Sequence, residues 1–268
     1  MLSRLATRVA PRLVWKWRIK SWGIDPGEPE SVLLPTVASK SRLSIDVGAA
    51  DGKYTAMLIP LSKQVVAFEP TPGALATLRT TFAATPMVVI EPVALSNESG
   101  VTTMRFVPDH FWRSTLERGN ALKYASGVSE LSVPMRRLDE YEFRAVGFIK
   151  IDVEGHEAAV LQGASGTIES SRPNVMIEVE EQHCAGAFDD VSGYFAARAY
   201  DGFFLLDGVV MPLSQFDIRI HQHVASLNER GERRPGCNYI NNFIFVPAER
   251  SARWQETCAA VDVSHATG

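Results

Sequence analysis

Residues 44–55, with the sequence SIDVGAADGKYT, constrain the fold of this chain more than any other stretch. The apolar positions predict a buried strand, the small residues after it predict a tight turn, and the turn opens a helix. Gly48 and Gly52 lack a β-carbon, so the backbone can turn sharply there and approach a ligand closely. The helix directs its unpaired N–H groups and the positive end of its dipole toward that ligand. We therefore expect a mostly parallel α/β sheet with a ligand beyond the carboxyl end of this strand.

The chemistry of this turn favours an adenosine ligand with a positive charge over a dinucleotide. The dinucleotide fingerprint G-x-G-x-x-G is incomplete, because Gly48 is followed by Ala50 and Lys53 at the next two offsets. Asp46, two residues before Gly48, suits the ammonium and sulfonium groups of S-adenosylmethionine. A second predicted strand ends at Glu69, where a carboxylate can bind a ribose diol. The alternative interpretation is a plain βαβ unit in which Glu69 is only solvated.

A second informative stretch, residues 148–157, places three carboxylates and an imidazole after another predicted strand. Glu154 and Glu157 would be favoured at a helix N-terminus by the dipole alone. Asp152 ends the strand itself, so it is expected to face the ligand crevice. An imidazole ordinarily changes its charge near neutrality, so His156 is also a candidate general base.

Two further segments add polar side chains. A strand predicted at residues 175–179 places Glu178 and Glu180 on one face, with His183 beyond it. Residues 97–146 are interpreted as an inserted hairpin with a long loop, and such loops often carry function. Trp112, Ser114 and Thr115 are its candidate substrate contacts, although an ordinary surface loop explains them as well.

Together, these motifs resemble the FkbM-type family of S-adenosylmethionine-dependent methyltransferases. The matching pieces run in order from about residue 43 to residue 247: IDVGAADGKYT, VVAFEP, EPVALSN, RRLDEY, FIKIDVEGHEAAVLQGA, IEVEE and NNFIFVP. The resemblance implies a class I methyltransferase fold, which is Rossmann-like α/β. Its sheet is expected to have seven strands, mostly parallel, with an antiparallel last strand and helices on both faces.

The resemblance also implies a cofactor site for S-adenosylmethionine. Asp46 and Gly48 would line the methionine moiety, Glu69 would take the ribose hydroxyls, and residues 93–96 would flank the adenine. The full set of expected cofactor-binding residues is Asp46, Gly48, Ala49, Asp51, Gly52, Tyr54, Glu69, Pro70, Val93, Ala94, Ser96 and Asp152.

Many relatives methylate hydroxyls, so we expect an O-methyltransferase acting on a sugar, a glycan or a small secondary metabolite. A protonated hydroxyl is a poor nucleophile, and Asp152 is the first candidate to orient or deprotonate it. The other catalytic candidates are Glu154, His156, Glu180 and His183, and the expected substrate contacts are Trp112, Ser114, Thr115, Glu178 and Asn241. Mg²⁺ held by Asp152 and nearby carboxylates is an alternative that we do not favour. Other hypotheses are N- or carboxyl-methylation and a non-catalytic subunit that binds S-adenosylmethionine within a membrane assembly.

The charge and cysteine composition limits the kinds of binding partner and cellular compartment that we expect. The 268 residues carry a formal net charge of −4, of which residues 1–22 contribute +6 and the remainder −10, so nucleic acid is not expected. Three cysteines without a C-x-x-C pair predict a reducing, cytoplasmic compartment and no structural zinc. The oligomeric state stays open, with a homodimer as one hypothesis.

The expected organisation is a basic amphipathic helix at residues 1–24, a linker and packing segment at 25–41, a methyltransferase domain at 42–247 and a frayed tail at 248–268. The basic helix has three interpretations. It lies on an anionic membrane surface, it is part of an organelle transit peptide, which has a similar composition, or, as we favour, it packs on the body of the protein or on a neighbouring subunit.

Overall fold

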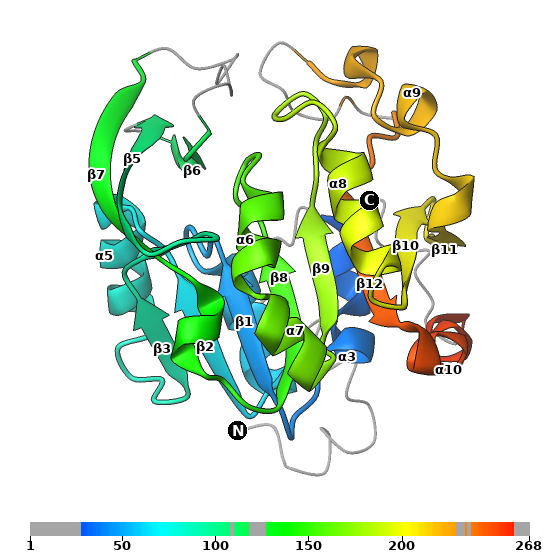
Figure 1. The fold of residues 1–268 in the computed structure, drawn as a ribbon, viewed down its shortest axis with the longest axis horizontal. Helices are drawn as coiled ribbons and strands as arrows, with labels where there is room; N and C mark the ends of the chain where they lie inside the picture. Colours follow the sequence, from blue (N-terminus) through cyan, green and yellow to red (C-terminus); the bar gives the residue numbers. More distant parts are fainter. Residues whose placement is uncertain (1–27, 108–109, 118–126, 229–233, 235–236, 260–268) are drawn as a thin grey trace.

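Two β-sheets organise the structure, a computed structural model that describes residues 28–107, 110–117, 127–228, 234 and 237–259 (Figure 1). The larger sheet has eight strands in the order β11-β10-β12-β9-β8-β1-β2-β3, and the smaller has four in the order β4-β7-β5-β6. The strands are β1 Leu43–Val47, β2 Gln64–Phe68, β3 Val88–Glu91, β4 Ala94–Leu95, β5 Gly100–Val107, β6 His110–Thr115, β7 Ser129–Arg136, β8 Val146–Ile151, β9 Asn174–Glu178, β10 Tyr200–Leu206, β11 Val209–Pro212 and β12 Asn242–Pro247.

The larger sheet confirms the expected parallel arrangement with an antiparallel last strand. Strands β9, β8, β1, β2 and β3 pair in parallel, and β12 runs antiparallel between β9 and β10. The expected number of seven strands is wrong by one. The apolar sequence GFFLLDGVV predicts a single strand, but it forms the hairpin β10–β11 around Asp207 and Gly208. Both turn residues have positive φ (49° and 79°), as a tight two-residue hairpin loop requires.

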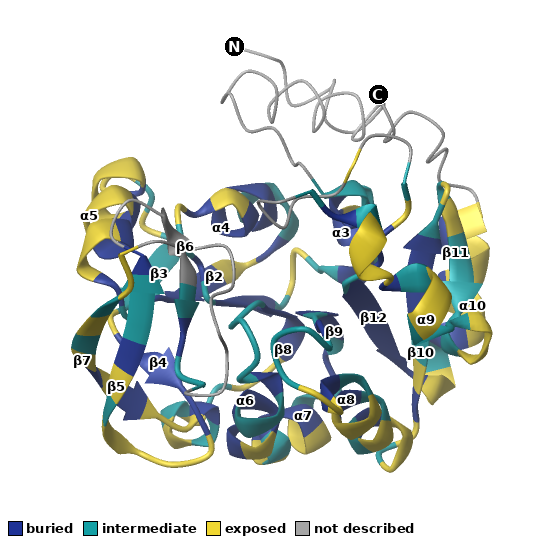
Figure 2. Cartoon of the chain, turned by 90° about the horizontal axis from the view of Figure 1, so that it is seen from above, coloured by how far each residue is buried: buried dark blue, intermediate teal, exposed yellow. Residues whose placement is uncertain are grey.

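Helices cover both faces of the larger sheet, as the view from above shows (Figure 2). The α-helices are α3 Leu34–Val37, α4 Lys53–Leu58, α5 Pro72–Thr81, α6 Glu157–Gly163, α7 Ser165–Ser171, α8 Ala187–Ala196, α9 Ile218–His221 and α10 Ala248–Ala259. The 3₁₀ helices are η1 Pro29–Leu33, η2 Ile59–Leu61, η3 Leu138–Tyr141, η4 Leu213–Gln215 and η5 Val224–Ser226. Helices α6, α7 and α8 cover one face, and α3, α4, α5 and α10 pack against the other.

The core follows from the two-residue period of the strands. In β8, Ile149 and Ile151 pack with Val160 and Leu161 of α6, whereas Phe148 packs on the opposite face with Leu34 of α3. All six side chains are fully or nearly fully buried. Because both faces are covered, the central strands read as nearly continuous apolar runs, and polar residues cluster where the strands end.

The smaller sheet occupies the predicted insertion. Strands β5 and β7 form the expected antiparallel hairpin. The segment at His110–Thr115, which shows no clean periodicity in the sequence, nevertheless forms β6 against β5. Ala94, Met104 and Val133 form the small core of this sheet.

Two boundary predictions need correction. Residues 248–259 are not a frayed tail but form α10, in which Trp254 packs on Phe203 with 4.9 Å between ring centroids. The apolar spacing of residues 191–199 predicts a helix there, whereas α8 begins four residues earlier, after Gly186 with φ +84°. The predicted basic helix and residues 260–268 lie outside the described residues.

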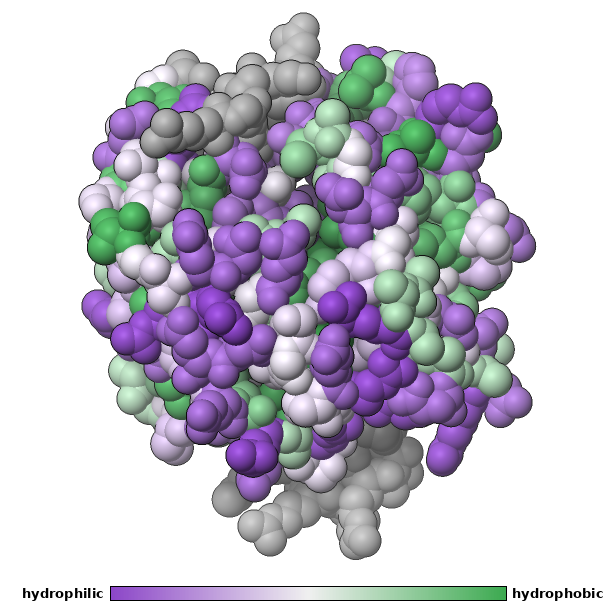
Figure 3. Space-filling view, viewed as in Figure 1, coloured by the Kyte–Doolittle hydropathy of each residue, from purple (hydrophilic) through white to green (hydrophobic). Residues whose placement is uncertain are grey.

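The face in Figure 3 is mostly polar, with hydrophobic residues in scattered patches. The large apolar side chains that the described residues expose are likewise dispersed: Val101, Val128, Val209, Ile220 and Val224. None of the described helices is both long and apolar enough to span a membrane.

Candidate active site

The turn after β1 is the structural base of the site. Gly48 has a φ of +79°, and a β-carbon at this position would lie 1.8 Å from the carbonyl oxygen of Asp152. The N–H of Asp152 donates to the carbonyl of Val47 at 3.0 Å, and the N–H of Gly48 donates to the carbonyl of Phe68 at 3.0 Å. The ends of β8, β1 and β2 are therefore packed backbone against backbone, which glycine alone permits without displacement.

Glu69 closes the neighbouring side of this turn. It is 3% exposed and accepts hydrogen bonds from the backbone N–H groups of Thr71 (2.7 Å) and Ala50 (3.0 Å), and from the Thr71 hydroxyl (2.6 Å). Burial raises the pKa of Glu69, and these hydrogen bonds oppose that shift. The carboxylate is thus fixed in orientation at the end of β2.

A cleft with an empty volume of about 610 Å³ lies over these strand ends. It runs between the larger sheet, α6 and the smaller sheet. Met104 and Ser114 of the smaller sheet, and Leu116 just after β6, form part of its wall. The lining residues are Val47, Gly48, Ala50, Phe68, Glu69, Pro70, Val93, Ala94, Leu95, Met104, Ser114, Leu116, Asp152, Val153, Glu154 and His156. The lining combines mainly apolar side chains with the carboxylates of Glu69, Asp152 and Glu154, the usual composition of a small-molecule site.

Asp46 lies on the other face of β1, beneath α4. It is 2% exposed, and its Oδ2 accepts a hydrogen bond from the Thr55 hydroxyl at 2.5 Å. Burial raises the pKa of Asp46 to about 6, although the bond from Thr55 opposes the shift. Asp46 does not line the cleft, so its geometry fits a residue that supports the turn from below.

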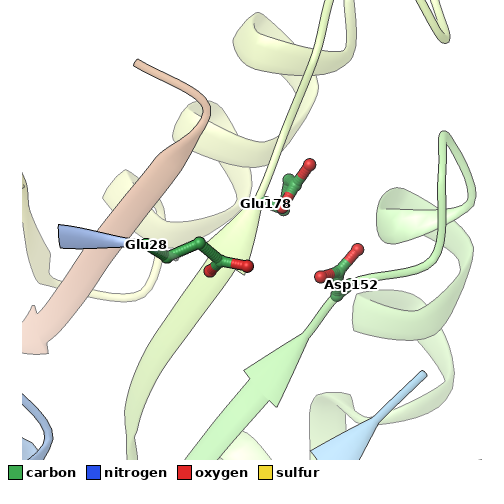
Figure 4. A group of neighbouring side chains, drawn as sticks. All are labelled: Glu28, Asp152 and Glu178. Atoms are coloured by element: carbon green, nitrogen blue, oxygen red, sulfur yellow. The ribbon is translucent and has the colours of Figure 1, made fainter. Parts of the chain in front are cut away.

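Three carboxylates converge beside the cleft (Figure 4). Oxygen atoms of Glu28, Asp152 and Glu178 all lie within 4.8 Å of one another. Lys150 Nζ lies 3.5 Å from Asp152 Oδ2. Asn241 Nδ2 donates to Glu178 Oε1 at 2.9 Å. Burial, followed by the charge of Asp152, raises the pKa of Glu178 well above its usual value.

His183 connects two further acids. Its Nδ1 lies 2.9 Å from Glu154 Oε2 and its Nε2 lies 4.0 Å from Glu180 Oε2. Burial opposes the charge of His183, but the hydrogen bond and charge of Glu154 and the charge of Glu180 outweigh it and raise the pKa to about 9. Tyr239 donates to Glu180 Oε2 at 2.9 Å. The imidazole is therefore held as a cation between carboxylates.

His156 makes a chain of hydrogen bonds of its own. Its Nδ1 lies 2.6 Å from Glu117 Oε1, and its Nε2 lies 2.9 Å from the hydroxyl of Ser96. The hydrogen-bonded series of Ser96, His156 and Glu117 resembles the serine, histidine and acid arrangement of a catalytic triad. Ser96, however, is 2% exposed and does not line the cleft. The chain of bonds therefore fixes the orientation of the His156 ring at the cleft wall instead of exposing a nucleophile.

A profile of the methyltransferase FkbM domain matches residues 46–201, more than half of the chain. The chain belongs to the FkbM methyltransferase family. Among solved structures, a methyltransferase FkbM from Methylobacillus flagellatus is similar with a TM-score of 0.50 and 18% identity. That match covers 77% of this chain but only 44% of the other.

A putative methyltransferase from Streptococcus mutans in complex with SAH is similar with a TM-score of 0.45 and 13% identity, covering 81% of this chain and 94% of that one. No curated protein matches the chain. The fold is that of a class I methyltransferase, with β11 as an additional edge strand.

Within this FkbM domain, the structure brings some of the predicted cofactor residues to the cleft and leaves others outside. Those that line it are Gly48, Glu69, Pro70, Val93, Ala94 and Asp152. Asp46, Ala49, Asp51, Gly52, Tyr54 and Ser96 are not part of the lining. Asp51 is exposed, whereas Ala49 and Tyr54 are buried in the protein.

The predicted catalytic and substrate-binding residues likewise divide into those that line the cleft and those that lie outside it. Asp152, Glu154, His156 and Ser114 line the cleft. Thr115 is fully buried and donates to the carbonyl of Glu154 at 2.7 Å, so it supports that turn. Glu178, Glu180, His183 and Asn241 lie in the acid groups beside the cleft. The side chain of Trp112 lies outside the described residues.

Sequence reasoning missed four residues of this FkbM site: Glu28, Glu117, Lys150 and Asn242. Lys150 carried a signal, because a lysine within the apolar strand sequence FIKID is expected to need a buried partner. Glu28 carried none, since it lies in a turn-rich segment far from the motifs in sequence.

Proposed function

We propose that this FkbM domain is an S-adenosylmethionine-dependent O-methyltransferase that acts on a hydroxyl of a saccharide or another small metabolite. One observation carries the proposal: a single cleft joins Glu69 and the Gly48 turn to the carboxylate of Asp152. A ligand that fills this cleft reaches from the end of β2 to the acid groups at the ends of β8 and β9.

The residues present fit the proposed cofactor. Phe68, Val93, Leu95 and Met104 give apolar walls for an adenine ring, and the fixed carboxylate of Glu69 suits a ribose diol. When bound, S-adenosylmethionine supplies an electrophilic methyl group on a sulfonium centre.

The chain contributes alignment, exclusion of water and acceptance of a proton. Asp152 lines the cleft and also belongs to the acid group beside the cleft. An acceptor hydroxyl bound where the cleft meets this acid group would therefore contact the Asp152 carboxylate. The Asp152 carboxylate would accept the hydroxyl proton as the acceptor oxygen gains the methyl group. The other acids and imidazoles have partners within the protein, as described above, which makes them supports in this scheme.

Calorimetric titration tests the cofactor part of this proposal. We expect the protein to bind S-adenosylmethionine and not NAD. The isosteric change Glu69→Gln should weaken that binding by about tenfold or more, because a charge-assisted hydrogen bond to a ribose hydroxyl is lost. Glu130→Gln, at an exposed position of β7, is the matched control and should bind normally. If the wild-type protein does not bind S-adenosylmethionine, the proposal is wrong.

Transfer of a labelled methyl group to a panel of saccharides and hydroxylated metabolites tests the reaction. Asp152→Asn should lower turnover by about 100-fold or more while the affinity for S-adenosylmethionine is retained. If Asp152→Asn leaves the turnover unchanged, Asp152 is not the base, and an amine acceptor, which needs less deprotonation, becomes the better hypothesis.

A further inference from the structure

Lys150 is a charged side chain enclosed in the middle of the protein. It lies on β8 two residues before Asp152, and its side chain is fully buried, with 0% exposure. A fully buried lysine is rare unless it is paired, because removing an ammonium group from water is costly. The surroundings of Lys150 must therefore provide compensating charge.

Three elements surround the ammonium group of Lys150. Asn242 of β12 accepts a hydrogen bond at 2.9 Å, and Asp152 Oδ2 lies 3.5 Å away. The ring of Tyr54 from α4 lies beneath the ammonium, 4.9 Å from the ring centroid to Nζ. The hydroxyl of this tyrosine donates to Glu28, which also accepts from Asn242 Nδ2 at 3.4 Å.

The ammonium of Lys150 and the carboxylates around it influence one another's pKa. Burial opposes the charge of Lys150, but the carboxylates of Asp152, Glu28 and Glu178 outweigh burial and raise its pKa. Burial raises the pKa of Glu28 and of Glu178, and the ammonium opposes that rise without outweighing it. The three carboxylates have the spacing of a metal site, yet a protein cation already lies beside them.

We propose that Lys150 is a positioning residue whose ammonium group takes the part of a divalent ion at the acceptor end of the site. It holds the carboxylate of Asp152 at the cleft and balances Glu28 and Glu178, so that methyl transfer proceeds without a metal. This inference rests on the proposed function only for the role of Asp152, and the charge balance of the cluster can be tested without activity.

The test uses Mn²⁺ as a probe, monitored by electron paramagnetic resonance of the free ion. The full-length wild-type protein should bind Mn²⁺ no more tightly than its Asp152→Asn variant, because Lys150 already balances the carboxylates. Lys150→Gln, which removes the charge but keeps polarity, should bind Mn²⁺ at least about tenfold more tightly than wild type. The double variant Lys150→Gln with Asp152→Asn should lose the gained affinity, which assigns it to this cluster.

Wild-type binding of Mn²⁺ that disappears in Asp152→Asn would overturn the inference, and so would Lys150→Gln without a gain in affinity. If Lys150→Gln does not fold, the comparison of wild type with Asp152→Asn still decides. Titration of the same samples with S-adenosylmethionine separates the two proposals. The proposed function fails if the wild type does not bind S-adenosylmethionine, whereas the Mn²⁺ titrations can contradict the role of Lys150 even when S-adenosylmethionine binds.

Where an acceptor has been found, turnover gives an independent readout. Chelation of metals with EDTA should leave wild-type turnover unchanged. Lys150→Gln should lower kcat without changing the affinity for S-adenosylmethionine, and added Mn²⁺ should restore part of it. Loss of wild-type turnover in EDTA, restored by Mg²⁺, would contradict the proposal.

Discussion

At the scale of single residues, Gly48 has the strictest steric requirement at the site. A methyl group at this position would overlap the carbonyl oxygen of Asp152, 1.8 Å away, and the φ of +79° disfavours any side chain. We expect Gly48→Ala to lower the free energy of unfolding by about 2 kcal/mol or more, and to weaken cofactor binding as the turn shifts. Urea unfolding measures the first effect and calorimetry the second.

The control for this change is Gly193→Ala. Gly193 lies in α8 with open space where the β-carbon would be. Alanine is the better helix former, so this variant should gain about 0.5–1 kcal/mol. Equal effects at Gly48 and Gly193 would show that close packing of the β1 turn on Asp152 is unimportant.

Glu157 should make stability depend on pH. Burial raises its pKa from 4.5 to about 7. Between these values the unfolded chain releases a proton that the folded protein keeps, so rising pH favours unfolding. The stabilisation is complete below about pH 4.5 and is lost as the pH rises through 7, by up to about 3 kcal/mol. The raised pKa of His183, about 9, adds a further loss above pH 6.5.

Urea unfolding at pH 5, 7 and 9 measures this trend. Glu157→Gln stays neutral and still offers an oxygen to the N–H of Gly155, which donates to Glu157 at 2.8 Å. The variant should therefore lose the contribution of Glu157 to the decline between pH 5 and 7. It should keep the smaller contribution of Asp46, whose pKa is raised to about 6, and the decline above pH 7. An unaltered pH profile would show that Glu157 is ionised in the folded protein.

At the scale of elements, α10 should be a structural part of the domain. Trp254 is 5% exposed, packs on Phe203 of β10 and donates from Nε1 to the Thr36 hydroxyl at 3.0 Å. We expect Trp254→Ala to cost about 3–5 kcal/mol in unfolding experiments, because it removes a large buried aromatic side chain. Gln255→Ala, on the exposed side of the same helix, should change stability little. Similar losses in both variants would mean that α10 contributes only through its helical propensity.

The sequence predicts those elements that carry a strong local pattern. The apolar strands beside Gly48 and Asp152 appear where expected, because burial on both faces and turn residues mark them. The hairpin at Asp207 and Gly208 was also readable, since Asp-Gly is a hairpin signal that we did not use. The helix around Trp254 could not be predicted from the sequence. Its apolar positions are few, and they are buried only by contacts with Phe203 and Thr36, which are far away in the chain.

At the scale of the whole molecule, the site depends on contacts that no local pattern records. Glu28 and Asn242 are 214 residues apart in sequence, yet they bond to each other beside Lys150. The acids at the ends of β8 and β9 could be predicted to meet, because parallel strands end at one edge of the sheet. The arrival of Glu28 at this edge depends on how η1 and α3 pack over the sheet, which only the folded structure shows.

A ligand that binds this assembled site should stabilise the whole domain. Binding to the folded state alone adds RT ln(1 + [L]/Kd), about 2.7 kcal/mol when the ligand is present at 100 times its Kd. For a domain of this size the melting temperature should then rise by about 5–10 °C with S-adenosylmethionine. Glu69→Gln should reduce the rise at the same ligand concentration, whereas Lys150→Gln should keep it, because Lys150 lies at the acceptor end. A rise that both variants retain would place the ligand outside the cleft between Glu69 and Asp152.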